Sequence, residues 1–213
     1  RSMPGSGTIT VSDANGDVGA YGLQFSGTGS AGTMYMVGSD SSALYLGAGG
    51  IVVESSSQVV QTMNSGKTQY LPIVLTASQT WSTTNLRVNS NGAGFRAYGA
   101  ISSVGITNLT IDGRGLANAY DTGNSSNRAA ITLGGNNSFT GTTTVTGGAA
   151  LWLDYTNESG SRLDDNRALI LAGGSVVLNG GSEDVEYVGS TIVDSGANSI
   201  YAGANGGGGT RNR

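Results

Sequence analysis

The chain has 213 residues, of which 37 are glycine and only 11% are charged, and its formal net charge is −4. It contains no cysteine and no histidine, which excludes a disulfide framework, thiol chemistry and histidine-based catalysis or metal binding, and makes enzymatic activity less expected. The acidic balance argues against nucleic acid as a partner, because phosphate binding needs clustered Lys and Arg.

The composition favours short strands over helices. Gly costs about 1 kcal/mol per helical position relative to Ala, and Thr and Val lose rotamer freedom in a helix but fit a pleated sheet. No run of about 18 apolar residues occurs, so no membrane insertion is expected. We expect an all-β body at residues 8–203, after an N-terminal extension or processing remnant at residues 1–7 and before a Gly-rich tail, or the start of a further turn of chain, at residues 204–213.

The expected strands of the N-terminal half are short apolar or alternating runs, and nearly every gap between them holds Gly, Asn, Ser or Asp. In chain order they are residues 8–11, 21–25, 33–37, 43–46, 51–53, 59–63, 73–76, 86–88, 104–106 and 109–111.

The gap after the first of these strands has a calcium-like pattern of alternating oxygen ligands, formed by Asp13, Asn15 and Asp17. A calcium loop requires Gly at its sixth position and a bidentate Glu at its twelfth, and this chain has Val18 and Gln24 there. An Asp/Asn/Gly turn explains the residues more simply. We therefore expect no metal and no other cofactor, with calcium at this turn as the alternative.

The longest segment with few strand-forming residues is 112–128. Its polar and aromatic candidates for ligand contact are Asp112, Arg114, Tyr120, Asp121 and Arg128. Loops of this length in a compact fold are often functional or mobile, so this segment is the candidate binding loop.

The C-terminal half continues the same pattern of short strands. Those expected are residues 130–133, 142–145, 151–153, 168–171, 175–178, 185–188, 191–193 and 199–201. Within the strand at 185–188, alternation places Asp184 and Glu186 on one face about 6.7 Å apart, near the lower limit of about 6.5 Å for an inverting glycosidase. If Val185 and Tyr187 point inward, both carboxylates simply face water, and this is the arrangement we expect.

Strands of three to five residues are too short for a wide sheet or a barrel wall, where about 5 to 10 residues are typical. In a solenoid each rung, meaning one turn of the chain, adds two or three short strands that pair with the rungs above and below. With about 20 to 25 residues per rung, the sequence predicts a right-handed parallel β-helix of about nine rungs. An antiparallel β-sandwich is the alternative, since it also has short strands and Gly-rich turns.

Residues 134–153 read GGNNSFTGTTTVTGGAALWL, in which a Thr-rich strand and a Leu-rich strand follow a turn made of Asn137, Phe139, Thr140 and Gly141. This pattern resembles the autotransporter-associated β-strand repeat, although Ala149 and Ala150 stand where that family prefers Gly-Thr. The resemblance implies a stacked β architecture in a surface protein. It names no reaction, ligand or partner.

The sequence therefore predicts a non-enzymatic scaffold, extracellular or on the cell surface, which is a segment of a bacterial surface passenger or a head-to-tail filament subunit. An open solenoid exposes strand edges at both ends, so association with copies or flanking repeats is expected. The alternative is a carbohydrate-binding or polysaccharide-cleaving β-helix that uses the candidate binding loop. N-glycosylation triplets begin at Asn108, Asn124, Asn136 and Asn157, as chance predicts for a chain rich in Asn, Ser and Thr.

Overall fold

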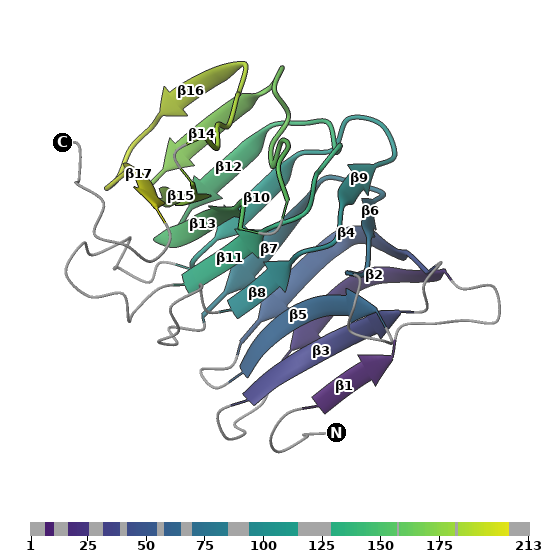
Figure 1. Ribbon diagram of the computed structural model, residues 1–213. Coiled ribbons are helices and arrows are strands. Elements are labelled where there is room, and N and C mark those ends of the chain that lie inside the picture. The colour runs from purple at the N-terminus through teal and green to yellow at the C-terminus, as the bar shows by residue number, and fades with distance from the viewer. Residues whose placement is uncertain are drawn as a thin grey trace.

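The computed structural model describes residues 7–10, 17–25, 32–38, 42–54, 58–64, 70–84, 94–114, 129–156, 158–181 and 183–204. All regular elements in these ranges are β-strands (Figure 1), so the expectation of an all-β chain is confirmed. Across the same ranges, no helix has the length and apolar character needed to cross a membrane.

The strands form two sheets. Sheet A contains, in order, β1 (Gly7–Thr10), β3 (Gly32–Gly38), β5 (Gln58–Asn64), β8 (Gly94–Ala97), β11 (Ala129–Leu133), β13 (Ala149–Asp154), β15 (Ser175–Gly180) and β17 (Ser199–Ala204). Sheet B contains, in order, β16 (Ser190–Val193), β14 (Ala168–Ala172), β12 (Thr143–Thr146), β10 (Leu109–Asp112), β7 (Gln79–Thr83), β4 (Leu44–Val53), β6 (Ile73–Leu75) and β9 (Ile101–Ser103), with β2 (Val18–Phe25) paired to β4.

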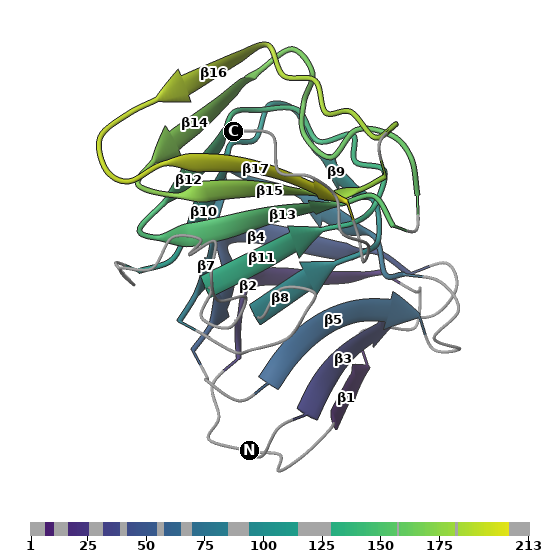
Figure 2. The same cartoon turned by 60° about the vertical axis from the view of Figure 1, so that its left-hand side comes forward.

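All strand pairings within the described residues are parallel, which disfavours the antiparallel sandwich. The chain passes back and forth between the sheets, and successive strands of each sheet stack from β1 at one end of the molecule toward β16 and β17 at the other (Figures 1 and 2). A parallel pair cannot be joined by a tight hairpin, so each return to the same sheet requires a crossover through the other one.

The number of residues per rung varies more than the sequence suggests. Ala149 lies 20 residues after its partner Ala129, whereas Ala130 lies 36 residues after its partner Gly94. The expected 20 to 25 residues is too short for the first and middle rungs, since Met34 lies 27 residues after its partner Gly7 and Trp81 lies 30 residues after its partner Ile51. Within the described residues, the stack of sheet A contains eight strands, compared with the expectation of about nine rungs.

The middle rungs bend within sheet B. The first part of β4 pairs with β6 and its last part pairs with β7, so the rung after β4 carries two short strands where β4 has one. The same division separates β9 from β10 in the following rung. The bend creates a corner at the start of β7, β10 and β12.

Sequence patterns do not predict β7, because its inward positions include polar residues. Gln79 is 5% exposed, and its amide oxygen accepts a hydrogen bond of 2.8 Å from the indole N–H of Trp81. The Gln79 side-chain N–H donates to the backbone oxygen of Leu46 at 3.2 Å. In a sequence, Gln is typical of loops. Gln79 can nevertheless lie in the core because its amide oxygen and its amide nitrogen both have hydrogen-bond partners.

Two expected strands are not formed as predicted. Residues 104–106 are outside any strand; β9 precedes them, and Ile106 makes only an isolated bridge to Thr140. Residues 185–188 are also not a strand. The expected strand at 86–88 lies outside the described residues, and so do most of the expected extension and tail.

The core lies between the sheets and consists of side chains stacked rung over rung. One column in sheet A is Phe95, Ile131, Leu151 and Val176, and one in sheet B is Trp81, Ile111, Val145 and Leu171. All eight are at most 1% exposed. Each such side chain stabilises the fold by about 1.5–3 kcal/mol relative to exposure, so the stacked aliphatic columns are the main source of stability.

Candidate functional site

The repeat-turn residues form the corner that leads into β12. The side chain of Asn137 lies at the centre of this corner and makes hydrogen bonds to other rungs. The side chain of Asn137 is 7% exposed; its oxygen accepts from the backbone N–H of Ile101 at 2.9 Å, and its N–H donates to the backbone oxygen of Arg162 at 3.0 Å. Ile101 belongs to the preceding rung and Arg162 to the following one. One amide therefore ties three rungs together.

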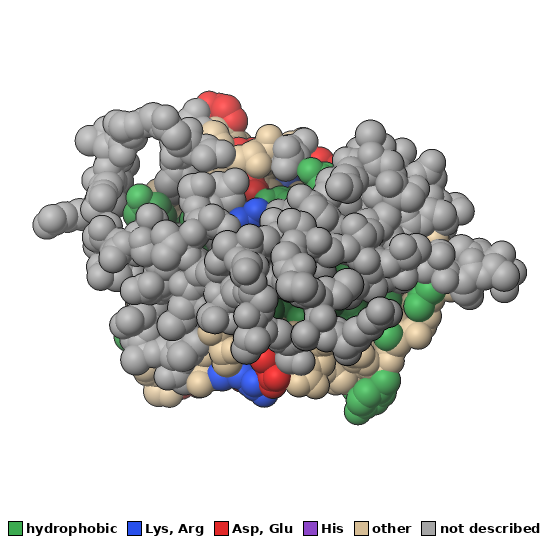
Figure 3. Space-filling model, turned by 90° about the horizontal axis from the view of Figure 1, so that it is seen from below, with side chains coloured by type: hydrophobic (Ala, Val, Ile, Leu, Met, Phe, Trp, Pro, Cys, Tyr) green, Lys and Arg blue, Asp and Glu red, His purple; other side chains and the backbone are tan. Residues whose placement is uncertain are grey.

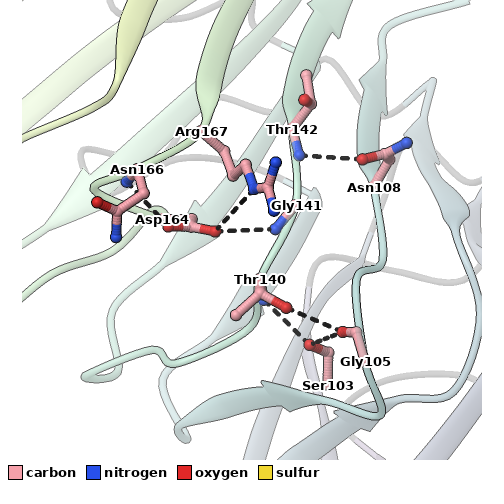
Figure 4. Close-up of polar contacts among 9 residues, drawn as sticks. All are labelled: Ser103, Gly105, Asn108, Thr140, Gly141, Thr142, Asp164, Asn166 and Arg167. Atoms are coloured by element: carbon pink, nitrogen blue, oxygen red, sulfur yellow. Dashed lines mark hydrogen bonds and ion pairs between the residues drawn. The ribbon is translucent and has the colours of Figure 1, made fainter.

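The other repeat-turn residues complete the same corner. Phe139 is 2% exposed and packs in the core. A Cβ on Gly141 would lie 2.1 Å from the backbone oxygen of Thr107, so only glycine fits. The Thr140 backbone N–H donates to the Ser103 hydroxyl oxygen at 3.0 Å, and its hydroxyl donates to the backbone oxygen of Gly105 at 2.9 Å (Figure 4).

Asp164 and Asn108 extend this set of rung-to-rung bonds. One Asp164 carboxylate oxygen accepts from the backbone N–H of Gly141 at 3.1 Å and lies 3.9 Å from Arg167 Nε, and the other accepts from the backbone N–H of Asn166 at 2.9 Å (Figure 4). The Asn108 side-chain oxygen accepts from the backbone N–H of Thr142 at 3.0 Å. We call Ser103, Asn108, Asn137, Thr140 and Asp164 the corner ladder.

A second polar cluster joins the connection between β13 and β14 to the segment before β16. The Glu186 carboxylate accepts from the backbone N–H groups of Arg162 at 3.0 Å and Leu163 at 2.9 Å, lies 3.0 Å from the Ser161 hydroxyl, and accepts from the Tyr155 hydroxyl. We call these five residues the Glu186 clasp. Burial raises the pKa of Tyr155 well above its usual value, and the hydrogen bond to Glu186 and the negative charge of Glu186 raise it further.

Arg162 supports the clasp from inside the molecule. It is fully buried, and its guanidinium donates to the backbone oxygens of Asp154 at 3.0 Å, Glu158 at 2.6 Å and Gly160 at 2.9 Å. The guanidinium carbon lies 4.5 Å from the centre of the Tyr155 ring. A buried charge is costly unless its donors are satisfied, so these carbonyls and the aromatic face fix the course of the connection at 154–162.

The clasp reverses the expected orientation of residues 184–187. Val185 and Tyr187 are 54% and 66% exposed, whereas Glu186 turns toward Tyr155. Asp184 also bonds the backbone, accepting from the N–H of Gly181 at 2.6 Å. The expectation that both carboxylates face water is wrong for Glu186, because backbone N–H groups of the connection between β13 and β14 bind it. Asp184 is half-buried and bonds a backbone N–H of its own segment. Both carboxylates accept hydrogen bonds from the protein backbone, which is a structural role.

Two of the five candidate binding-loop residues lie in the described part of the chain. The Asp112 carboxylate accepts from the backbone N–H of Arg114 at 2.8 Å, and Arg114 Nη1 lies 3.4 Å from a carboxylate oxygen of Glu54 at the surface. Arg114 has a φ of 55°, the left-handed conformation, as it leaves β10. The remaining three, Tyr120, Asp121 and Arg128, lie outside the described residues.

The calcium alternative is described only at Asp17. Its carboxylate accepts from the backbone N–H of Ala43 at 2.9 Å, so it connects adjacent rungs. Asp13 and Asn15 fall outside the described ranges. Where the chain is described, no cluster of three or more His, Cys, Asp or Glu side chains could hold a metal ion.

On the face seen from the side of β1, the coloured acidic and basic side chains form small groups, and at the lower edge of the view a basic and an acidic group adjoin (Figure 3).

The sequence did not indicate Arg162, Tyr155 or Glu186 as one cluster. The feature of the sequence that could have pointed to this cluster is that charged residues, which are rare in this chain, occur in the connections between apolar strands. Which of these residues come into contact depends on how the rungs align, and local sequence patterns do not specify that alignment. Comparisons of this chain with protein-family models, with curated proteins and with solved structures found no match.

Proposed function

We propose that this chain is a non-enzymatic structural scaffold, extracellular or on the cell surface, built as a right-handed parallel β-helix. The observation that carries the proposal is the use of its polar side chains. Asn137, Asp164 and Glu186, which have the chemistry most useful for binding or catalysis, accept hydrogen bonds from the backbone of other rungs. Their role is to hold one rung to the next.

The outer face of sheet B supports an adhesive role for the same scaffold. Thr80, Thr110 and Thr144 are in register on β7, β10 and β12, which places them about 4.8 Å apart along one row. β-Branched threonine is restricted at χ1, so the row offers an ordered line of hydroxyl and methyl groups. Such a face suits many weak contacts along the length of the molecule.

The similarity of residues 134–153 to the autotransporter-associated repeat is the reason for proposing a passenger segment or a filament subunit. In that repeat the turn is followed by strands that require stacked neighbours. Here Asn137 and Gly141 depend on the rungs on either side for their bonds and their spacing, which is the behaviour of a repeat unit.

The second candidate function is recognition or cleavage of a polysaccharide. The observation that favours it is the exposure of two tyrosines near the N-terminal end, Tyr21 at 78% and Tyr45 at 37%. Exposed aromatic rings can stack on sugar rings, and binding surfaces often retain such side chains.

Three measurements on the full chain separate these functions. The scaffold predicts a small-angle X-ray scattering profile that matches the stacked parallel sheets, no saturable binding on a glycan array and no reducing ends released from polysaccharides. A scattering profile that does not fit the parallel stack would contradict the scaffold, and saturable binding lost in Tyr21→Ala would replace it with the polysaccharide function. Val104→Ala is the matched control, since it removes an exposed apolar side chain elsewhere.

A further inference from the structure

Exposed apolar side chains gather in the last rung, residues 183–204. Among the described residues nine large hydrophobic side chains are exposed, and five of them belong to this rung: Val185, Tyr187, Ile192, Val193 and Ile200. Contiguous exposed apolar surface in a soluble protein marks an interaction site. The last rung therefore differs from the rest of the surface.

Two of these side chains occupy core positions that nothing in the described structure covers. Val193 pairs with Leu171 in sheet B, and Ile200 pairs with Val176 in sheet A. Leu171 and Val176 are 1% exposed, whereas Val193 is 67% exposed and Ile200 is 56% exposed. The aliphatic columns thus continue to the end of the stack and are open there.

The edge strands at this end lack the features that usually prevent an edge strand from pairing with another chain. In natural proteins these features are Lys, Pro, inward-pointing charges or bulges. The sequences of β16 and β17 are STIV and SIYAGA, without a charge or a proline. Within the described residues β16 pairs only with β14 and β17 only with β15, and both pairings are regular (Figure 2).

The opposite end of the same chain offers a matching edge in sheet A. There β1 pairs only with β3 among the described strands, its sequence GTIT is uncharged, and its pairing is regular. The neighbouring edge strand β2 has a register shift between Ala20 and Gly22, which makes sheet B less suited to a continuous joint. Sheet A can therefore continue from one molecule to the next.

We infer that the last rung is a docking surface for a second copy of this chain, whose β1 adds in parallel to β17 and covers Ile200. The inference rests on the proposed scaffold function and adds the partner and the polarity of its self-association. Strand addition supplies main-chain hydrogen bonds, and the open column supplies apolar contact. Because the contact is head to tail, repetition gives a linear row.

The first test charges the open column and measures mass against concentration by sedimentation velocity. Val193→Lys with Ile200→Lys should weaken association about tenfold or more. Val104→Lys with Ile106→Lys is the matched control, because those side chains are 63% and 66% exposed and lie in the β9–β10 connection. The control pair should leave association within about twofold of the unmodified chain.

The second test reads the polarity of the contact. The chain has no cysteine, so Thr8→Cys and Tyr201→Cys each introduce a single thiol, one in β1 and one in β17. Thr8 and Tyr201 belong to the same row of sheet A, so an in-register contact brings the two thiols to the same face. A disulfide-linked dimer should form when the two variants are mixed and not with either one alone.

Three results would overturn the inference: a monomer at every concentration, equal weakening by the control pair, or Tyr201→Cys dimers formed without the Thr8→Cys partner. In the first case a monomer whose scattering profile matches the parallel stack would leave the scaffold function standing. A monomer whose profile does not fit that stack would remove the scaffold itself.

Discussion

At the scale of single residues, the repeat turn depends on positions where a side chain is either required or forbidden. Asn137 is required because its amide both accepts and donates between rungs. Gly141 is required because the Thr107 carbonyl occupies the space of a Cβ. The motif that resembles a known repeat is therefore explained by contacts with neighbouring rungs.

Replacing Gly141 by Ala should lower the free energy of unfolding by about 1–3 kcal/mol, the usual cost of overpacking. A Cβ there would lie 2.1 Å from a backbone oxygen, and backbone cannot move aside as a flexible side chain can. Urea unfolding followed by circular dichroism measures the change. Gly19→Ala is the control, since a Cβ at Gly19 meets no atom within 4 Å; equal loss in both variants would contradict the packing explanation.

Tyr155 gives the protein a specific sensitivity to alkaline pH. Its pKa is raised in the folded state by burial and by Glu186, whereas the unfolded value is about 10. The stability due to neutral Tyr155 is therefore fully present below pH of about 10 and is lost as pH rises further. Tyr155→Phe should be less stable near neutral pH, by about 1 kcal/mol for the lost hydrogen bond, but should lose less stability above pH of about 10.

Denaturant midpoints across alkaline pH test this expectation. Tyr98, whose pKa is also raised, chiefly by burial, remains in both proteins and serves as a common background. Parallel pH profiles for the two proteins would show that the Tyr155 hydroxyl does not contribute.

At the scale of strands, stability comes from columns of inward side chains that cross several rungs. Leu151 on β13 and Ile200 on β17 belong to the same column of sheet A, two rungs apart. Leu151 is fully buried, whereas Ile200 is 56% exposed. An aliphatic side chain of this column therefore contributes more to the free energy of unfolding at the centre of the stack than at its end.

Leu151→Ala should lower the free energy of unfolding by about 2–5 kcal/mol, as other buried Leu truncations do. Ile200→Ala should cost much less, because that side chain already contacts water in the isolated chain. Equilibrium unfolding at low protein concentration measures both. A similar loss at the two positions would mean that the last rung is covered in solution.

At the scale of the whole molecule, a stack of rungs is stabilised by contacts between neighbours, so its ends are the least stable parts. The central strands β12 and β13 have strands on both sides, whereas β16 and β17 have one described neighbour each. Local opening should begin at the end rungs, the last rung among them, and spread inward.

Hydrogen exchange measured by mass spectrometry tests this gradient. Peptides from β12 and β13 should exchange at least about tenfold more slowly than those from β16 and β17, since a factor of ten corresponds to 1.4 kcal/mol in the opening equilibrium. Uniform protection along the stack would indicate one cooperative unit. Higher protein concentration should slow exchange in β17, where the second copy is inferred to dock.

Most of the strand series could be predicted from the sequence, because short apolar runs between Gly, Asn and Ser depend only on local propensity. The strand β7 could not, since buried Gln79 resembles a loop residue until its partners Leu46 and Trp81 are in place. The corner residues were recognised as a turn, but their partners 25 to 36 residues away were not predictable.

The amino-acid sequence by itself determined that this chain forms a series of β-strands, without cysteine or histidine chemistry and with few charges. Only the tertiary structure decided that the strands pair in parallel, that Glu186 faces the protein while Val185 and Tyr187 face solvent, and that the aliphatic columns are open at the last rung. The physical reason is that strand propensity acts over neighbouring residues, whereas rung-to-rung register sets which distant donors and acceptors meet.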